Sequence, residues 1–99
     1  MNQLTVSRKV IVTNPQGLHA RPADLFVKTA SRFTSRVEVV KGNERVDGKS
    51  ILAILTLASV QGTELMIEAT GDDAQGAVDA LVQLVARDFF EGDSQAATH

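Results

Sequence analysis

A histidine and an arginine lie two positions apart in the segment Gly17-Leu18-His19-Ala20-Arg21-Pro22-Ala23. The turn-rich residues 14–17 precede the pair, and Pro22 is tolerated in the first turn of a helix, so the pattern predicts a helix that begins at Ala20, directly after His19. The free backbone N–H groups of a helix start attract anions, and an arginine can donate two hydrogen bonds to a phosphate. The segment therefore predicts a site that holds a phosphoryl group, with His19 as the acceptor.

A histidine suits this chemistry because an imidazole titrates near pH 6.5 and is largely neutral at cytoplasmic pH. Its ring nitrogen is then a nucleophile without a separate general base. The helix start and Arg21 would offset the negative charge of a phosphoryl group only in part, which favours transient loading over permanent binding. The competing interpretation is a surface histidine that caps a helix and carries nothing.

The spacing of apolar residues predicts the elements that position this segment. Alternation predicts strands over residues 9–13, 36–41 and 64–70, and a short strand around Arg45 and Val46 that forms a hairpin with the second of them. Steps of three and four predict helices over residues 20–31 and from 74 to near Gly92, and residues 51–57 form a short apolar helix. The order βαββαβα predicts an α+β fold, in which a four-stranded antiparallel sheet carries three helices on one face as an open-faced β-sandwich.

Composition and charge exclude several classes of protein. A chain of 99 residues forms one domain, for which we expect an ordered core over about residues 8–91 and a tail over 92–99. The absence of cysteine excludes disulfides and thiolate zinc sites, and we expect no metal and no cofactor. A net charge of −2 and the absence of Trp and Tyr argue against nucleic-acid binding. The first nine residues lack the apolar run of a secretory signal, and no apolar run approaches bilayer length, so we expect a cytoplasmic protein without membrane insertion.

The segment GLHARPA after a first strand, followed by GKSI at residues 48–51 before a short apolar helix, resembles HPr, the histidine-containing phosphocarrier family of the bacterial phosphotransferase system. The pattern extends from Val10 to about Arg87. The resemblance implies a monomeric carrier, not an enzyme, that accepts a phosphoryl group from phosphoenolpyruvate-charged enzyme I and passes it to enzyme IIA-type proteins for sugar transport. It further implies phosphorylation of the δ nitrogen of His19, with the backbone amides of Ala20 and Arg21 facing the phosphate and the Arg21 side chain balancing its charge.

The chain departs from the family at Gln16, where relatives usually carry a shorter polar residue such as Ser or Asn. A side-chain cap from this position is therefore not expected.

A second candidate site lies at Ser50. Ser50 matches the serine that an ATP-dependent kinase, with its phosphorylase, modifies in regulated members of the HPr family, whereas by position alone it is a plain helix cap. The resemblance also implies an apolar docking patch beside the histidine, made of Leu18, Ile51, Leu52 and Leu55. The alternative is that all four are core residues.

Other interpretations remain open. Arg21, Lys28 and Arg32 follow each other at steps of seven and four with Lys49 nearby, as either a solvated helix face or a surface that steers an acidic partner. The chain could be an HPr-like regulatory protein of nitrogen-type signalling or transcriptional control with little sugar transport. An acyl-phosphate hydrolase is a weaker alternative, because no Asn or carboxylate is placed with Arg21 to orient a water molecule. A pure interaction module, in which the histidine is incidental, is the third.

Overall fold

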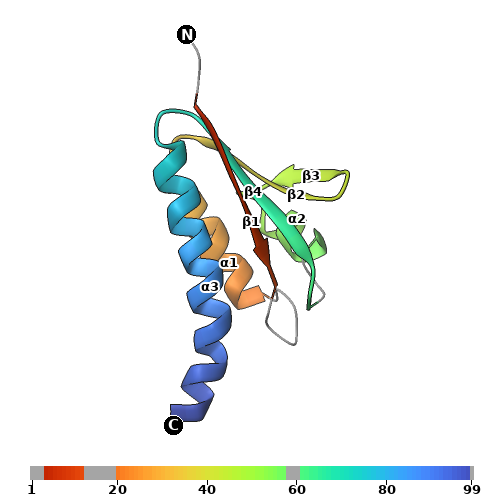
Figure 1. The fold of residues 1–99 in the computed structure, drawn as a ribbon, viewed down its shortest axis with the longest axis vertical. Helices are drawn as coiled ribbons and strands as arrows, with labels where there is room; N and C mark the ends of the chain where they lie inside the picture. The colour runs from red at the N-terminus through yellow and green to blue at the C-terminus, as the bar shows by residue number, and fades with distance from the viewer. Residues whose placement is uncertain (1–3, 13–19, 58–60, 99) are drawn as a thin grey trace.

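The structure is a computed structural model that describes residues 4–12, 20–57 and 61–98, with the backbone alone at Ala20 and residues 87–98. The elements follow the predicted order βαββαβα (Figure 1). They are β1 (Thr5–Ile11), α1 (Ala20–Ala30), β2 (Arg36–Lys41), β3 (Glu44–Asp47), α2 (Ile51–Leu57), β4 (Glu64–Thr70) and α3 (Ala74–Thr98).

The strands form one antiparallel sheet in the order β1-β4-β2-β3. In the register, Val10 lies opposite Leu65, and Val39 lies opposite both Ile67 and Val46. The β2–β3 hairpin turns at Gly42, whose φ of 58° lies in the left-handed region that glycine adopts without strain. The predicted hairpin and the antiparallel sheet are confirmed.

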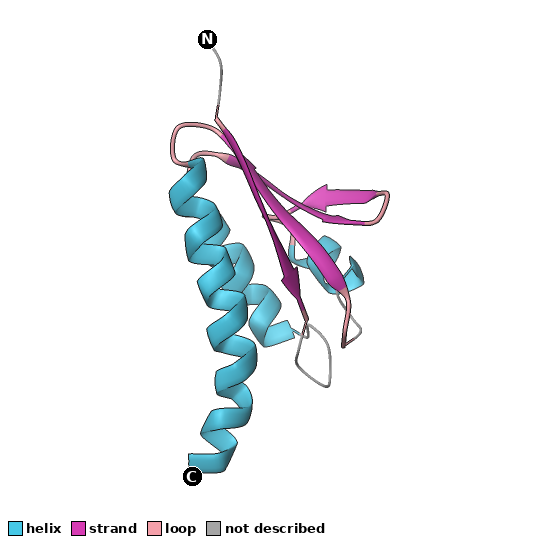
Figure 2. Ribbon diagram, in the orientation of Figure 1, coloured by secondary structure: helices cyan, strands magenta, loops and turns pink. Residues whose placement is uncertain are grey.

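The three helices cover one face of this sheet, as the colours by secondary structure show (Figure 2). The helices α1 and α3 lie side by side, α3 packs on β1 and β4, and α2 packs on α1 and β3. Alternate residues of β1, β2 and β4 point toward the helices and meet their apolar stripes in a single core. The buried apolar residues are Val10, Val12, Ala23, Phe26, Ala30, Val37, Val39, Ile54, Leu57, Leu65, Ile67, Ala69, Ala74, Ala77, Val78, Leu81, Leu84 and Val85.

Some element boundaries differ from the prediction, most of all the start of the first strand and the end of the last helix. The first strand begins at Thr5 and ends at Ile11, four residues earlier at its start than expected. Its polar residues Ser7, Arg8 and Lys9 do not interrupt it, because its backbone groups pair with β4 from Thr5 onward and an edge strand tolerates exposed side chains.

The last helix does not end near Gly92 but continues to Thr98, so most of the expected tail over 92–99 has helical backbone. A single glycine in a helix costs about 1 kcal/mol relative to alanine but removes no backbone hydrogen bond. Among the helices that the structure describes, none combines the length and hydrophobicity needed to span a bilayer.

A carboxylate joins the α1–β2 turn to the start of α3. Asp73 accepts hydrogen bonds from the backbone N–H groups of Thr34 and Ser35 at 2.9 Å each, and from the hydroxyl of Ser35. These bonds, led by the one from the Ser35 hydroxyl, lower the pKa of Asp73 from its ordinary value of 3.8 to about 2. The far end of α1 is thereby attached to the start of α3.

Candidate functional site

The first turn of α1 is the described part of the predicted phosphoryl site. The helix begins at Ala20, Arg21 is exposed, and Pro22 is buried in the first turn, where its missing N–H breaks no helical hydrogen bond. The first turn contains no acidic residue, so the free amides and the Arg21 guanidinium present positive charge together. Leu18 and His19 themselves lie outside the described residues, as does Gln16.

The buried face of α1 fixes the direction of this helix start. Ala23, Phe26 and Ala30 are each at most 4% exposed and pack into the core. Substitution on the opposite side of the first turn, at Arg21, therefore removes charge without opening the core.

The predicted basic face along α1 is only partly present. Lys28 is exposed, and its Nζ lies 3.0 Å from a carboxylate oxygen of Asp24 one turn earlier. Arg32 is exposed but lies beyond Ala30, the last residue of α1, so it does not continue the helical face. To continue the basic face as far as Arg32, α1 would need two more helical residues than it has, so positive charge next to the site comes chiefly from Arg21.

Ser50 immediately precedes α2 and caps it. Its Oγ accepts a hydrogen bond from the backbone N–H of Ala53 at 3.4 Å, and its carbonyl oxygen accepts one from Ile54 at 3.1 Å. The cap geometry predicted from the sequence is confirmed. Ser50 is half-buried and directly precedes the short helix that carries three of the predicted docking residues, Ile51, Leu52 and Leu55.

The four predicted docking residues are not all core residues. Leu52 is 74% exposed, whereas Ile54 and Leu57 of the same helix are 2% and 3% exposed. Ile51 and Leu55 are half-buried at the edge of the core. A short helix buries one stripe, so the alternative that all four are core residues is wrong for Leu52, while Leu18 lies outside the described residues.

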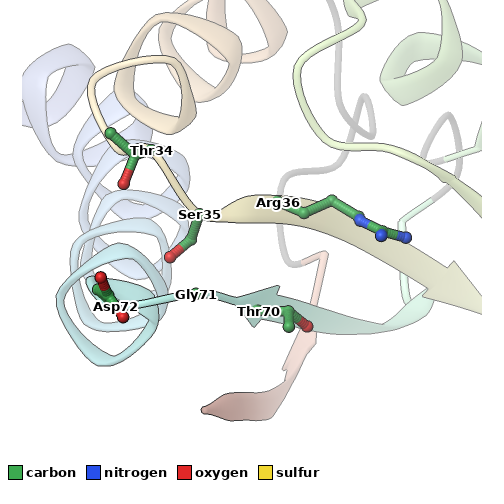
Figure 3. A pocket seen from close by; sticks show the side chains of 6 residues that line it. All are labelled: Thr34, Ser35, Arg36, Thr70, Gly71 and Asp72. Atoms are coloured by element: carbon green, nitrogen blue, oxygen red, sulfur yellow. The ribbon is translucent and has the colours of Figure 1, made fainter. Parts of the chain in front are cut away.

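Two polar features elsewhere on the described surface lie apart from the start of α1. An open hollow is lined by Thr34, Ser35, Arg36, Thr70, Gly71 and Asp72 (Figure 3). The first three follow the C-terminal end of α1, and the other three lie at the end of β4 and in the turn before α3. An α-helix of 11 residues is about 16 Å long, so this hollow is a full helix length from the predicted phosphoryl site. In Figure 3 the guanidinium of Arg36 points along β2, away from the hydroxyls of Thr34 and Ser35.

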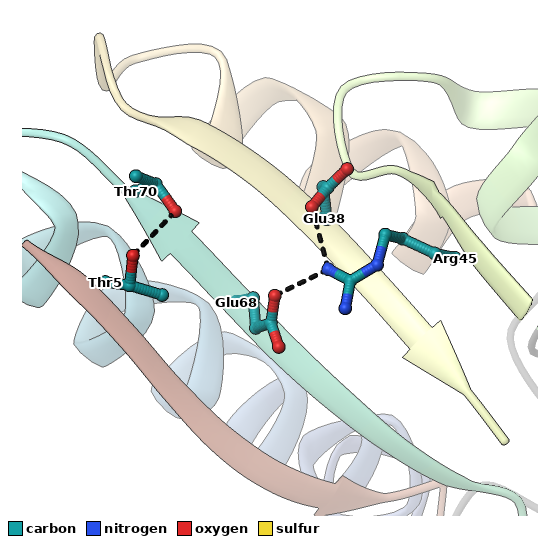
Figure 4. A network of polar contacts seen from close by, with 5 residues as sticks. All are labelled: Thr5, Glu38, Arg45, Glu68 and Thr70. Carbon is teal, nitrogen blue, oxygen red and sulfur yellow. Dashed lines mark hydrogen bonds and ion pairs between the residues drawn. The ribbon is translucent and has the colours of Figure 1, made fainter. Parts of the chain in front are cut away.

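The second feature is a charge network on the sheet face that the helices leave open (Figure 4). Arg45 Nη1 of β3 donates to Glu38 of β2 at 2.8 Å and to Glu68 of β4 at 2.6 Å. These bonds raise the pKa of Arg45, first through Glu68 and then through Glu38. Glu38 and Glu68 are direct neighbours in the sheet register, so Arg45 separates two like charges. We assign this network to the stability of the sheet.

The side-chain contacts of Asp73, Arg45 and Lys49 were not predicted from the sequence. The partners of Asp73 and Arg45 lie far away in the sequence or in another strand, where no periodic pattern indicates them. The Nζ of Lys49 donates to the carbonyl oxygen of Phe33 at 3.0 Å, so Lys49 faces the α1–β2 turn.

Within the described ranges, no group of three or more His, Asp or Glu residues is arranged to hold a metal ion.

The sequence of this chain matches a known protein family. The family model described as the PTS HPr component phosphorylation site matches residues 6–87. The phosphocarrier protein HPr of Neisseria meningitidis serogroup A is 40% identical over 88 residues, which cover 89% of this chain and 99% of the relative.

Solved structures agree with this comparison. HPr from Thermoanaerobacter tengcongensis matches with a TM-score of 0.79 and 44% identity, over 85% of this chain and 94% of the other. Crh of Bacillus subtilis, described as a catabolite repression protein that forms a swapped dimer, matches with a TM-score of 0.67 and 44% identity, over 83% and 94%.

Proposed function

The chain belongs to the HPr family of phosphocarrier proteins, and from this premise we propose that it carries a phosphoryl group on His19 between enzyme I and enzyme IIA-type proteins of the phosphotransferase system. In the accepting step the δ nitrogen of His19 attacks the phosphorus of phosphorylated enzyme I. The new N–P bond forms as the donor's bond to phosphorus breaks, and the donor leaves with that electron pair. The carrier is loaded without being a catalyst.

The single observation that carries the proposal is the start of α1 directly after the GLHARPA histidine, with Arg21 exposed in its first turn. The phosphoryl group would accept hydrogen bonds from the backbone amides of Ala20 and Arg21, and the exposed Arg21 guanidinium would offset part of its charge. An exposed site holds the group less tightly than a buried pocket would, because water screens the attraction. Moderate stabilisation allows onward transfer.

Partner proteins would dock next to this site on the exposed side of α2. Leu52 and the half-buried Ile51 and Leu55 present apolar surface there, and Leu18 would join it from the segment before α1. Such apolar surface gains free energy when a partner removes it from water.

Ser50 would serve as a regulatory phosphorylation site for a serine kinase and phosphorylase. A phosphate on a residue that caps a helix adds negative charge where the helix dipole tolerates it. The charge would then act on partners at the neighbouring Ile51 and Leu52 more than on the fold.

The test is incubation of the whole chain with phosphoenolpyruvate and enzyme I, followed by mass spectrometry of the modified residue. We expect one phosphoryl group on His19 that is labile in acid and stable in base, and none in the His19→Ala variant. Incubation with the kinase and ATP should instead modify Ser50. Absence of modification at His19 in the wild-type chain would refute the carrier function, and turnover of acyl phosphate without a phosphoprotein would favour a hydrolase.

The likeness to Crh favours one alternative, a regulatory protein with little part in sugar transport. A transfer assay with separate sugar-type and nitrogen-type acceptor domains distinguishes the two functions. We propose the sugar-type carrier, acting in the cytoplasm as a monomer without a cofactor. Analytical ultracentrifugation of the purified chain tests whether it is a monomer, because a swapped dimer like that of Crh would have twice the molecular mass.

A further inference from the structure

The residue before Ser50 makes a contact that the proposed function does not use. Lys49 is half-buried, and its Nζ donates a hydrogen bond to the backbone carbonyl oxygen of Phe33 at 3.0 Å. Phe33 belongs to the turn between α1 and β2, and Lys49 to the turn between β3 and α2. The bond therefore joins two turns that are 16 residues apart in the sequence.

The acceptor of this bond is held in place from both sides. The backbone N–H of Phe33 donates to the carbonyl oxygen of Ala30 at 3.2 Å, and that of the next residue, Thr34, donates to Asp73 at 2.9 Å. The ring of Phe33 packs against the core. The Phe33 carbonyl is consequently a fixed point relative to α1 and α3.

The backbone that leads to Lys49 is held as well. The N–H of Gly48 donates to the carbonyl oxygen of Val37 at 2.8 Å, and a Cβ on Gly48 would lie 2.6 Å from Val37 Cγ1. The N–H of Lys49 donates to Asp47 Oδ1 at 2.9 Å. These bonds fix the backbone of the turn, and the Lys49 side chain adds the connection from it to Phe33.

The helix that follows depends on such attachments. A helix of seven residues is too short to be stable alone, so its orientation comes from its contacts. Its two buried residues, Ile54 and Leu57, lie at its fourth and seventh positions. Its first turn is held by the half-buried Ile51, which packs at the edge of the core, and by the residues that precede the helix. The exposed Leu52 is in that first turn.

We infer that Lys49 is a positioning residue for partner docking. Its bond to the Phe33 carbonyl holds the first turn of α2 so that Leu52 and its half-buried neighbours meet an apolar groove on the partner protein. Lys49 acts through α2 and does not touch the phosphoryl group. This inference rests on the proposed carrier function. It adds a residue on which the affinity between the carrier and its partner protein depends.

The experiment compares Lys49→Met with the wild-type chain as the substrate of enzyme I. Methionine keeps an apolar stem but removes the donor, so the first turn of α2 loses its attachment to Phe33. We expect KM to rise about threefold to tenfold, the size expected for loss of one charged hydrogen bond shared between orientation and stability. The kcat should not change, because His19 and Arg21 are intact.

Three controls separate positioning from charge. Lys41→Met removes the same charge from an exposed residue of β2 and should leave KM unchanged. The rise in KM of Lys49→Met should persist at 0.5 M salt, where attraction between exposed charges is largely screened, and Lys49→Arg should restore most of the affinity because arginine can donate to the same carbonyl.

An unchanged KM in Lys49→Met, or a rise that disappears at high salt, overturns the inference. If Lys49→Met does not fold, Lys49→Leu gives the same test with a shorter side chain that also lacks a donor, and faster amide exchange confined to α2 is expected in it. A wild-type chain that is not phosphorylated at His19 refutes the proposed function and this inference with it. Phosphorylation of the wild type with no effect of Lys49 overturns the inference alone.

Discussion

Replacing Leu52 by alanine should weaken partner docking and leave the fold intact. Leu52 is 74% exposed in the free protein, so it contributes little to the core. Burying a leucine side chain completely is worth about 1.5 to 3 kcal/mol, and three quarters of that gain is still open to a partner at this position. Leu52→Ala should therefore remove about 1 to 2 kcal/mol from the association free energy, which is roughly a fivefold to thirtyfold rise in KM.

The matched control is two residues further along the same helix. Ile54 is 2% exposed, and Ile54→Ala should lower the free energy of unfolding by about 2 to 5 kcal/mol through the cavity that it leaves. The folded fraction of that variant should still bind with a KM close to that of the wild type. Leu52→Ala, in contrast, should change the free energy of unfolding by less than about 0.5 kcal/mol.

The assay is the initial rate of phosphoryl transfer from enzyme I at increasing concentrations of each variant, together with urea unfolding followed by circular dichroism. A wild-type KM for Leu52→Ala would refute α2 as the docking surface. A large loss of stability in Leu52→Ala would refute the assignment of Leu52 to the exposed side of the helix.

Three further predictions concern single charged residues. Arg21→Ala should shorten the lifetime of the phosphohistidine or change its transfer rate without altering urea unfolding, because Arg21 is exposed; an unchanged lifetime and rate would remove Arg21 from the mechanism. The pKa of Asp73 is lowered in the folded state from 3.8 to about 2, so its stabilising effect is complete above about pH 4 and is lost as the pH falls toward 2. Asp73→Asn should be less stable at pH 7 and lose less stability than the wild type over that range, which unfolding at several pH values checks. Arg45→Met leaves Glu38 and Glu68 facing each other without their shared cation, so it should unfold at lower urea concentration than the wild type, and added salt should recover part of the difference by screening their repulsion.

Local patterns in the sequence predict most elements closely. The strands over 36–41 and 64–70 and the helix over 51–57 match the structure to the residue, because alternation and helical spacing report which side of each element is buried. The predicted ends of elements were wrong where the burial of side chains does not determine them. Thr5 to Arg8 form strand through backbone pairing at the edge of the sheet, and α3 passes Gly92 because no proline or cap stops it.

At the candidate site, too, local patterns predict one part and tertiary packing decides the other. Residue types and spacing in GLHARPA predict the phosphoryl chemistry, and the structure confirms that a helix begins there with Arg21 exposed. The sequence alone left Leu52 undecided between core and docking surface. Its exposure was decided by Ile54 and Leu57, which turn the opposite side of α2 into the core.

The sequence by itself determined the order of the elements and predicts the phosphoryl chemistry, since both depend on residues that are neighbours or one helical turn apart. The tertiary structure decided which carboxylate holds the α1–β2 turn, which arginine separates two glutamates on the open sheet face, and which lysine reaches the Phe33 carbonyl. Each of these contacts joins residues brought together only when the sheet pairs and the helices pack on it. No short-range sequence pattern predicts these contacts, because the partners are distant in the sequence and come within hydrogen-bond distance only in the folded chain.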